Sequence, residues 1–253
     1  MCSVFVYSIV KYMRVVILAG GLGTRLHPVT LEMPKPLLTV KRRPILNHLL
    51  DLFKKHGIDQ PTILINKNHL EDYQWWQKRY EKEVPANLEL VVEPEPLGTF
   101  GGLKIVKERL NEPFILSNGD ELKDFDLLAL VKAHKENPAK PAATIALVEV
   151  ENPSDYGVPT LIEDKYGASP VCRITSFLEK PVNPPSNFIS SGLYILEPEI
   201  FQYADWSKGF LMIEKDIFPK VAAAGKLAGY KVKNGKWFDC GTFSRWEKAI
   251  KEW

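Results

Sequence analysis

A glycine-rich loop follows the first strongly apolar segment of the chain and limits what the chain can fold into. Residues 15–18 (VVIL) predict a buried strand, and residues 20–25 (GGLGTR) come soon after it. Three glycines in four positions let the backbone turn sharply and expose its N–H groups, which at a strand end can bind phosphate. Arg25 adds a forked cation suited to phosphate oxygens. The loop therefore predicts a phosphate-binding site.

The loop matches neither of the two common glycine-rich nucleotide motifs. A P-loop ends in Gly-Lys-Ser or Gly-Lys-Thr, whereas Arg25 is followed by Leu26. A dinucleotide-binding fingerprint has another glycine three residues after Gly23, where this chain again has Leu26. A glycine-rich turn beside a surface arginine, with no ligand, is the alternative interpretation of the loop taken alone.

The composition is that of an ordinary globular protein and excludes several classes of function. The chain has 253 residues, 45% hydrophobic and 25% charged, which is ample for one large domain. Its net charge of +2 predicts no general attraction to nucleic acid or to membranes. The three cysteines show no paired spacing, which predicts a reducing compartment, the cytoplasm, and neither a disulfide framework nor a zinc site.

Residues 1–12 form an apolar N-terminal extension of uncertain status. They lack the basic start and the small-residue cleavage site of a secretory signal. Met13 lies just before the first predicted strand, so translation could start at Met1 or at Met13. We expect residues 13–253 to form a single domain.

Strands and helices alternate along the first half of the chain. Predicted strands cover residues 62–66, 88–92 and 113–117, and predicted helices cover 44–57, 69–82, 99–110 and 125–136. This alternation indicates an α/β fold with a largely parallel sheet, in which ligands lie beyond the carboxyl ends of the strands.

The second half of the chain is richer in strands. Predicted strands cover residues 142–150, 157–162, 171–179, 188–196, 227–232 and 236–238, and predicted helices cover 215–224 and 242–251. Pro219 would end or kink the first of these helices. We expect this half to add a β-rich subregion to the same sheet.

The glycine loop and the residues after it resemble the signature of the sugar-1-phosphate nucleotidylyltransferases. That signature, Gly-Gly-x-Gly-Thr-Arg-Leu-x-Pro-x-Thr followed by Pro-Lys-Pro, stands here at residues 20–30 and 34–36. The resemblance covers about residues 14–247 and looks closest to the mannose- and heptose-1-phosphate guanylyltransferases. It implies a Rossmann-like α/β fold with a mixed, mostly parallel sheet flanked by helices and a β-rich sugar-binding subregion. We expect no left-handed β-helix tail, because the chain ends too soon for one.

The resemblance also implies a reaction. A phosphate oxygen of a sugar 1-phosphate attacks the α-phosphorus of a nucleoside triphosphate and expels pyrophosphate, which needs positioned cations and carboxylates that hold Mg²⁺. The implied partners are a nucleoside triphosphate and a sugar 1-phosphate, with neither nucleic acid nor membrane, and a homo-oligomer is one option.

Individual site residues are implied by their match to the family's motifs. The implied catalytic cations are Arg25, Lys35 and Lys180, and the implied Mg²⁺ ligands are Asp120 and Asp239. The implied nucleotide-binding residues are Leu18, Gly20, Gly21, Gly23, Thr24, Glu93, Gly98, Thr99 and Gly119. The implied sugar-binding residues are Gly157, Glu179, Ser190 and Tyr194, with Ser190 standing where relatives often have Asn.

Several of these residues also have a plain structural interpretation. Each Asp could cap a turn or a helix, Glu179 and Lys180 could form an exposed strand end, and Thr99 could cap the predicted helix 99–110. On the predicted helix 69–82, three aromatic residues near one face are expected in the core or at a subunit contact: Tyr73, Trp76 and Tyr80.

Glu93 bears on the choice of base. Relatives that use uracil or thymine often have Gln there, whose amide can both donate and accept, whereas a carboxylate only accepts. Guanine offers two adjacent donors, so Glu93 favours GTP; dTTP or UTP with glucose 1-phosphate is the alternative, and backbone groups could instead read the base.

Two other classes of function compete with this interpretation. A metal-dependent glycosyltransferase would use an Asp-x-Asp motif, which occurs as Asp124-Phe125-Asp126, although an Asp before a helix is often its cap. A non-catalytic sugar-nucleotide sensor would keep the fold but lose a metal ligand or a phosphate-binding cation, and all of these are present here.

Overall fold

The chain folds into two compact units, and each unit is built from more than one segment of the chain. The structure, a computed structural model, describes residue 10, residues 13–162 and residues 169–253. Unit 1 comprises residues 1–96, 117–125 and 235–253, and unit 2 comprises residues 97–116 and 126–234. The predicted extension 1–12 lies, apart from Val10, outside the described residues, and the assignment of residues 13–253 to one domain stays a prediction.

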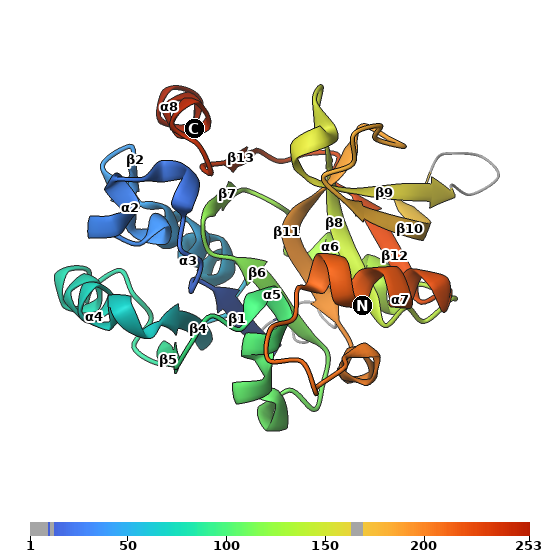
Figure 1. Ribbon diagram of the computed structural model, residues 1–253, viewed down its shortest axis with the longest axis horizontal. Helices are drawn as coiled ribbons and strands as arrows, with labels where there is room; N and C mark the ends of the chain where they lie inside the picture. Colours follow the sequence, from blue (N-terminus) through green and yellow to red (C-terminus); the bar gives the residue numbers. More distant parts are fainter. Residues whose placement is uncertain (1–9, 11–12, 163–168) are drawn as a thin grey trace. The chain divides into compact units, whose positions relative to one another are not determined.

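Unit 1 is built around three parallel strands (Figure 1). Their order is β5 (Glu89–Glu93), β4 (Pro61–Asn66) and β1 (Arg14–Leu18). Val15 pairs with Pro61, and Thr62 pairs with Glu89. A parallel pair needs a crossover connection, and helices α3 (Ile45–Lys55) and α4 (Leu70–Arg79) lie in the chain between these strands. The predicted parallel β–α alternation is therefore confirmed.

The packing of α3 explains why this helix forms where the sequence predicts it. The residues at helical spacing, Ile45, Leu46, Leu49, Leu50 and Phe53, are all buried. They give the helix one apolar face, while its lysines stay on the solvent side and near the C-terminal end, where cations are favourable.

Short elements complete unit 1. They are the helix α2 (Val29–Glu32), the 3-10 helices η1 (Thr24–Leu26), η2 (Lys35–Leu37) and η3 (Lys67–His69), and the hairpin of β2 (Thr39–Val40) and β3 (Arg43–Pro44). Strand β7 (Glu121–Lys123) pairs in antiparallel fashion with β13 (Trp237–Asp239), and α8 (Phe243–Glu252) follows. A core cluster joins these distant segments: Leu26, Leu38, Val40, Ile45, Leu122, Cys240 and Ala249. This cluster fixes β7, which directly follows Asp120, and β13, which ends in Asp239.

Strand β6 (Phe114–Asn118) begins in unit 2 and ends in unit 1. The rest of unit 2 is rich in strands, in the order β11 (Phe188–Leu196), β8 (Ala143–Glu149), β12 (Leu227–Lys231), β10 (Val171–Glu179) and β9 (Gly157–Ile162). Only β8 and β12 run parallel here; the other neighbours are antiparallel. The expected Rossmann-like α/β fold, with a mixed sheet and a β-rich second half, is confirmed.

The helical elements of unit 2 are short. They are α5 (Gly98–Gly101), α6 (Leu127–Lys135), α7 (Phe218–Ala223), the 3-10 helices η4 (Gly102–Ile105), η5 (Lys107–Arg109), η6 (Pro153–Asp155) and η7 (Pro198–Tyr203), and the π-helix η8 (Ile213–Ile217). The prediction of one helix over 99–110 is wrong, because consecutive glycines at 101 and 102 disfavour a continuous α-helix and the chain forms three short pieces. Pro219 stands in the first turn of α7, where its missing N–H is tolerated.

Aromatic residues of α4 divide between the core and the surface. Tyr73 and Trp76 are fully buried, as predicted, whereas Trp75 is 62% exposed. Trp75 lines a cavity of about 150 Å³ together with Met33 and Tyr80.

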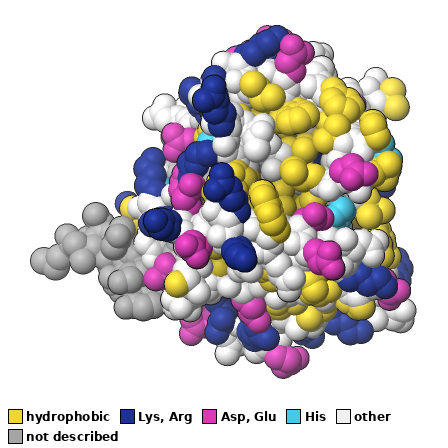
Figure 2. Space-filling view, turned by 90° about the vertical axis from the view of Figure 1, so that its left-hand side faces the viewer, with side chains coloured by type: hydrophobic (Ala, Val, Ile, Leu, Met, Phe, Trp, Pro, Cys, Tyr) yellow, Lys and Arg dark blue, Asp and Glu magenta, His cyan; other side chains and the backbone are white. Residues whose placement is uncertain are grey.

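Figure 2 shows hydrophobic side chains gathered over a broad area of one face of the molecule. No described helix has both the length and the apolar character needed to cross a membrane.

Candidate active site

The glycine loop has the sharp turn that its sequence predicts. Gly23 has φ +62°, in the left-handed region, and it is the N-cap of η1. The Thr30 hydroxyl donates to the Gly23 carbonyl over 2.8 Å, and a Cβ at position 23 would press against the Thr30 side chain. The loop is therefore fixed from within unit 1, and the side chains of Thr24 and Arg25 stay exposed.

The loop lies at the carboxyl ends of unit 1 strands, where ligands are expected. Ala19 donates to the Leu64 carbonyl of β4 over 2.8 Å, and Gly119 donates to the Leu18 carbonyl of β1 over 2.9 Å. A Cβ at position 119 would come within 2.9 Å of the Leu18 carbonyl oxygen, so the backbone approaches β1 more closely than another residue would allow. Residues 18–25 and 118–120 are thereby brought to the same edge of the strands.

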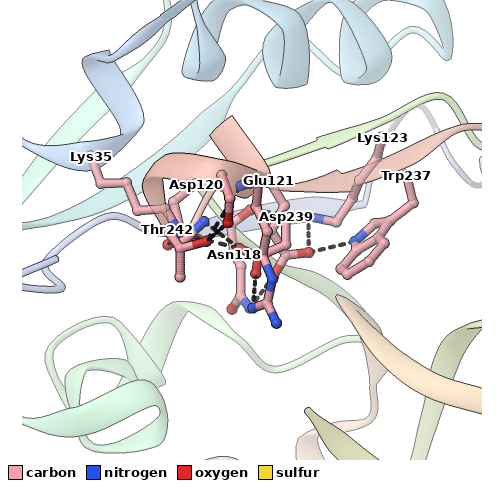
Figure 3. Close-up of polar contacts among 11 residues, drawn as sticks. Lys35, Asn118, Asp120, Glu121, Lys123, Trp237, Asp239 and Thr242 are labelled. Atoms are coloured by element: carbon pink, nitrogen blue, oxygen red, sulfur yellow. Dashed lines mark hydrogen bonds and ion pairs between the residues drawn. The ribbon is translucent and has the colours of Figure 1, made fainter. Parts of the chain in front are cut away.

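Two carboxylates of unit 1 converge on one ammonium group (Figure 3). Lys35 Nζ lies 2.7 Å from Asp120 Oδ2 and 3.4 Å from Asp239 Oδ1. The three residues come from η2, from the turn between β6 and β7, and from the end of β13. The structure therefore brings three of the implied site residues together.

Arg25 lies beside the same group. A Cβ placed on Gly241 would come within 2.7 Å of both Arg25 Nη2 and Asp239 Oδ1. Gly241 also donates its N–H to Asp239 Oδ1 over 2.6 Å, so Asp239 does cap a turn. The alternative interpretation of Asp239 as a turn cap is therefore confirmed, and its role as a metal ligand stays a prediction.

The charges at this site stabilise one another. Burial by itself lowers the pKa of Lys35, but Asp120 and Asp239 outweigh it and raise the pKa above its ordinary value. Burial raises the pKa of Asp120, but Lys35 outweighs it and the pKa lies below its ordinary value. Lys35 is therefore an ammonium and Asp120 a carboxylate at neutral pH.

The donor set fits a Mg²⁺-type ion. Two carboxylates already converge on a cation, and Mg²⁺ is commonly held by one or two carboxylates together with substrate phosphates. No cluster of three or more His, Cys, Asp or Glu side chains that could hold a metal occurs in the part of the chain that the structure describes. An ion held by these two carboxylates would take its further ligands from substrate phosphates or water.

A buried polar network, which the sequence analysis missed, lies next to the two Asp residues on strands β7 and β13. Glu121 accepts from Asn118 Nδ2 and from Trp237 Nε1, each over 2.8 Å, and pairs with Lys123 at 3.2 Å (Figure 3). The Lys123 side chain is fully buried. Because Glu121 and Lys123 flank Leu122 on β7 and Trp237 starts β13, the network ties together the strands next to Asp120 and Asp239. In the sequence, the opposite charges on either side of Leu122 were the feature that could have indicated this network.

Arg245 is a second site residue that the sequence analysis missed. Its Nη1 lies 2.8 Å from Asp239 Oδ2, on the oxygen that Lys35 does not contact. Arg245 follows the helix cap Thr242, whose hydroxyl accepts from the Arg245 N–H over 3.4 Å. No local pattern in the sequence distinguishes this arginine from other surface cations of α8.

Glu93 lies beneath the glycine loop. It ends β5, its residue is 6% exposed, and a Cβ on Gly20 would collide with its Oε2. Burial raises the pKa of Glu93 to about 7. A carboxylate kept so poorly solvated gains from any donor brought to it.

The remaining implied nucleotide residues belong to unit 2. Gly98 has φ +83°, and a Cβ there would collide with the Leu211 backbone. Thr99 donates to Glu214 Oε2 over 2.6 Å and accepts from the Ile213 N–H over 2.9 Å, so the prediction that Thr99 caps a helix is wrong. Both residues are fixed to the segment 211–214.

The implied sugar residues form two local groups in unit 2. Lys180 has φ +52°, donates its N–H to the Tyr156 carbonyl, and pairs with Glu179 at 3.7 Å. A Cβ on Gly157 would lie 3.2 Å from Glu179 Oε2. In the second group, the Ser190 hydroxyl donates to the Tyr194 hydroxyl over 3.1 Å.

Comparison with known proteins identifies the family. A family model described as nucleotidyl transferase matches residues 14–252. The chain belongs to the nucleotidyl transferase family. The predicted resemblance to sugar-1-phosphate nucleotidylyltransferases is thereby confirmed.

Curated proteins are similar to this chain in sequence. A mannose-1-phosphate guanyltransferase of Yarrowia lipolytica is 38% identical over 232 residues, which are 90% of this chain and 61% of that protein. The mannose-1-phosphate guanyltransferase beta-B of Xenopus laevis is 36% identical, with the same coverage of 90% and 61%. This chain thus spans about 61% of the length of these curated relatives.

Solved structures share the architecture. HddC of Yersinia pseudotuberculosis, complexed with GMP-PN, has a TM-score of 0.76 at 27% identity and covers 95% of this chain and 99% of its own. A UDP-glucose pyrophosphorylase complexed with UDP-glucose has a TM-score of 0.76 at 24% identity, covering 94% of this chain and 97% of its own, which supports the fold alone.

The Asp-x-Asp motif of the competing interpretation has structural roles. Asp126 accepts from the Ala129 N–H over 3.0 Å and caps α6, as the sequence predicts for an Asp before a helix. Asp124 forms an exposed ion pair with Lys55 at 3.2 Å. Neither contact resembles a metal site, and the family match favours the nucleotidyl transferase interpretation over a glycosyltransferase.

Proposed function

We propose that this protein catalyses Mg²⁺-dependent transfer of a nucleoside monophosphate from a nucleoside triphosphate to a sugar 1-phosphate. The products are a nucleotide sugar and pyrophosphate, and the proposed substrates are GTP with mannose 1-phosphate or heptose 1-phosphate. The observation that carries the proposal is the convergence of Lys35 on Asp120 and Asp239, with Arg25 beside them.

The reaction forms one bond and breaks one. A phosphate oxygen of the sugar 1-phosphate bonds to the α-phosphorus, and the bond from that phosphorus to the bridging oxygen of pyrophosphate breaks. No protein nucleophile is required, so the residues act by positioning and by charge. Backbone N–H groups of residues 20–25 bind phosphate, and the Arg25 guanidinium holds the departing pyrophosphate.

Lys35 and Lys180 have distinct roles in this proposal. Lys35 neutralises charge near the α-phosphate, and Lys180 binds the phosphate of the sugar, held by the backbone bond of its N–H to Tyr156. Asp120 and Asp239 would hold Mg²⁺, which supplies further neutralisation of the phosphate oxygens when bound. Gly157, Glu179, Ser190 and Tyr194 would form the sugar side.

The burial of Glu93 supports GTP as the nucleotide. The carboxylate is an acceptor only, and guanine presents N1–H and a 2-amino group side by side. Two donors would favour its ionised form against the burial that raises its pKa. The relatives named as mannose-1-phosphate guanyltransferases also support GTP; dTTP or UTP with glucose 1-phosphate is the alternative.

Pyrophosphate release tests the proposal directly. We would combine Mg²⁺ with each of GTP, dTTP, UTP, CTP and ATP, and each with mannose, glucose, N-acetylglucosamine and heptose 1-phosphates. Release only when GTP and one sugar phosphate are both present is expected. Silence across this grid from folded protein that still binds nucleotide would favour the sensor function.

Two matched Asp variants separate the competing enzyme classes. Asp120→Asn is expected to lower turnover by roughly 100-fold or more while the fold is kept, since a metal ligand is lost. Asp124→Asn, which alters the Asp-x-Asp motif and a surface ion pair, is expected to leave turnover unchanged. The reverse pattern would indicate the glycosyltransferase chemistry instead. A cytoplasmic location and a homo-oligomer stay predictions.

A further inference from the structure

Lys35 holds a position that a divalent cation would also seek. Its ammonium lies between Asp120 and Asp239, at 2.7 and 3.4 Å, and its side chain is only 7% exposed. Lys35 stands in η2 between Pro34 and Pro36, which fix the backbone that carries it. The backbone that positions the ammonium between the carboxylates is therefore held by two prolines.

Three of the four carboxylate oxygens at this site contact a cationic side chain. Asp120 Oδ2 and Asp239 Oδ1 contact Lys35, and Asp239 Oδ2 contacts Arg245 at 2.8 Å. Asp239 Oδ1 also accepts from the Gly241 N–H. The charge of the carboxylate pair is thus compensated by the chain itself.

A free divalent ion would have to compete with this internal cation. Approaching both carboxylates brings two positive charges within a few ångströms of the Lys35 ammonium, where poor solvation makes repulsion strong. Nucleotide phosphates change the balance, because they bring negative charge that can pair with the ammonium and also supply oxygen ligands for the ion.

We propose that Lys35 occupies the cation position while no nucleotide is bound, so that the divalent ion is admitted only together with the triphosphate. Lys35 then has two tasks: it closes the carboxylate pair to free metal, and it moves to the phosphates when they arrive. This inference rests on the proposed function in taking Asp120 and Asp239 as the metal ligands.

The test measures Mn²⁺ binding to the nucleotide-free protein, by the electron paramagnetic resonance signal of free Mn²⁺. Lys35→Met keeps the length of the side chain and removes its charge, and it is expected to bind Mn²⁺ at least 10-fold more tightly than the wild type. The double variant Lys35→Met/Asp120→Asn is expected to lose that gain. Lys55→Met removes a lysine from an exposed Lys–Asp pair and is the matched control, expected to bind as the wild type does.

Lys35→Gln provides a second neutral variant, which keeps a donor for the carboxylates if Lys35→Met does not fold. Equal Mn²⁺ affinity of the wild type and both neutral variants would overturn the inference, as would a gain that survives Asp120→Asn. Failure of the pyrophosphate-release grid would instead remove the proposed function, and the Mn²⁺ titration uses no substrate, so the two failures are distinguishable.

Discussion

The carboxylate of Glu93 lies so close to Gly20 that a Cβ at position 20 would collide with its Oε2 atom. Gly20 comes after β1 and Glu93 ends β5, the two strands that lie on either side of β4. Their proximity explains a glycine at position 20 by space rather than by dihedral angle. It also couples the loop proposed to bind phosphate with the group proposed to read the base.

Substituting this glycine should therefore destabilise the fold. Gly20→Ala is expected to lower the free energy of unfolding by about 1–3 kcal/mol, because the methyl group overpacks a buried contact. Gly21→Ala is the matched control for stability, since a Cβ there meets no heavy atom within 4 Å. Urea unfolding measures both. A double-mutant cycle with Glu93→Ala should remove most of the Gly20→Ala effect; full additivity would contradict the contact.

The raised pKa of Glu93 predicts a pH dependence of stability. Burial raises this pKa to about 7 from 4.5, so between these pH values the folded chain binds more protons than the unfolded chain. The free energy of unfolding contributed by Glu93 therefore falls as pH rises through this window. Glu93→Gln, which does not titrate, should gain on the order of 1–2 kcal/mol relative to the wild type between pH 5 and pH 8, after discounting for solvent screening. A constant difference across pH, measured by urea unfolding, would refute this.

The buried pair of Lys123 and Glu121 should respond strongly to the loss of one partner. Lys123→Met leaves the Glu121 carboxylate in a site where burial raises its pKa, and is expected to cost about 3–5 kcal/mol of unfolding free energy. Lys55→Met breaks an exposed pair and should cost less than about 1 kcal/mol. Chemical denaturation would compare the two. Similar losses of unfolding free energy in the two variants would contradict a strong contribution from the buried pair.

Gly98 should tolerate no side chain. Its φ of +83° disfavours other residues, and a Cβ there would collide with the Leu211 backbone. Gly98→Ala is expected to destabilise by about 3 kcal/mol or more. Gly225→Ala has a similar φ of +70° with open space around the Cβ, so it isolates the dihedral cost of about 1–2 kcal/mol. Thermal or urea unfolding of the pair separates the collision from the dihedral strain.

Arg245 should act on turnover through Asp239. Arg245→Met removes the partner of Asp239 Oδ2 and is therefore expected to lower kcat about 10-fold. The variant should also need a higher Mg²⁺ concentration for half-maximal rate, while KM for the sugar 1-phosphate changes little. Arg245→Lys should restore part of the rate. Lys251→Met, which alters an exposed pair with Glu247 on the same helix, is the control. Equal kcat values for the two Met variants would argue against the positioning role.

Much of the fold could be predicted because it follows from local pattern. The apolar spacing of α3 and the alternation of strands with helices depend on nearby residues, and both are confirmed. The short motifs around Lys35, Asp120 and Asp239 also placed residues that the structure brings together. Each of these signals lies within a few residues of the chain.

What could not be predicted depends on contacts between distant segments. Trp237 donates to Glu121, although 116 positions separate them in the chain. The residues near β7 in the sequence do not indicate that Glu121 has this partner. Thr99 would be a good helix cap by its type, but its hydroxyl bonds to Glu214 instead, because the segment packs against residues 211–214. Tertiary contacts overrode the local preference in both places.

Unit 1 is assembled from three separate stretches of the chain, and the last of them, residues 235–253, supplies Asp239 and Arg245. During synthesis the glycine loop, Lys35 and Asp120 therefore emerge long before the second carboxylate. A nascent chain that stops before residue 235 carries the glycine loop, Lys35 and Asp120 but lacks Asp239 and Arg245. The proposed site is therefore complete only after unit 2 has been made.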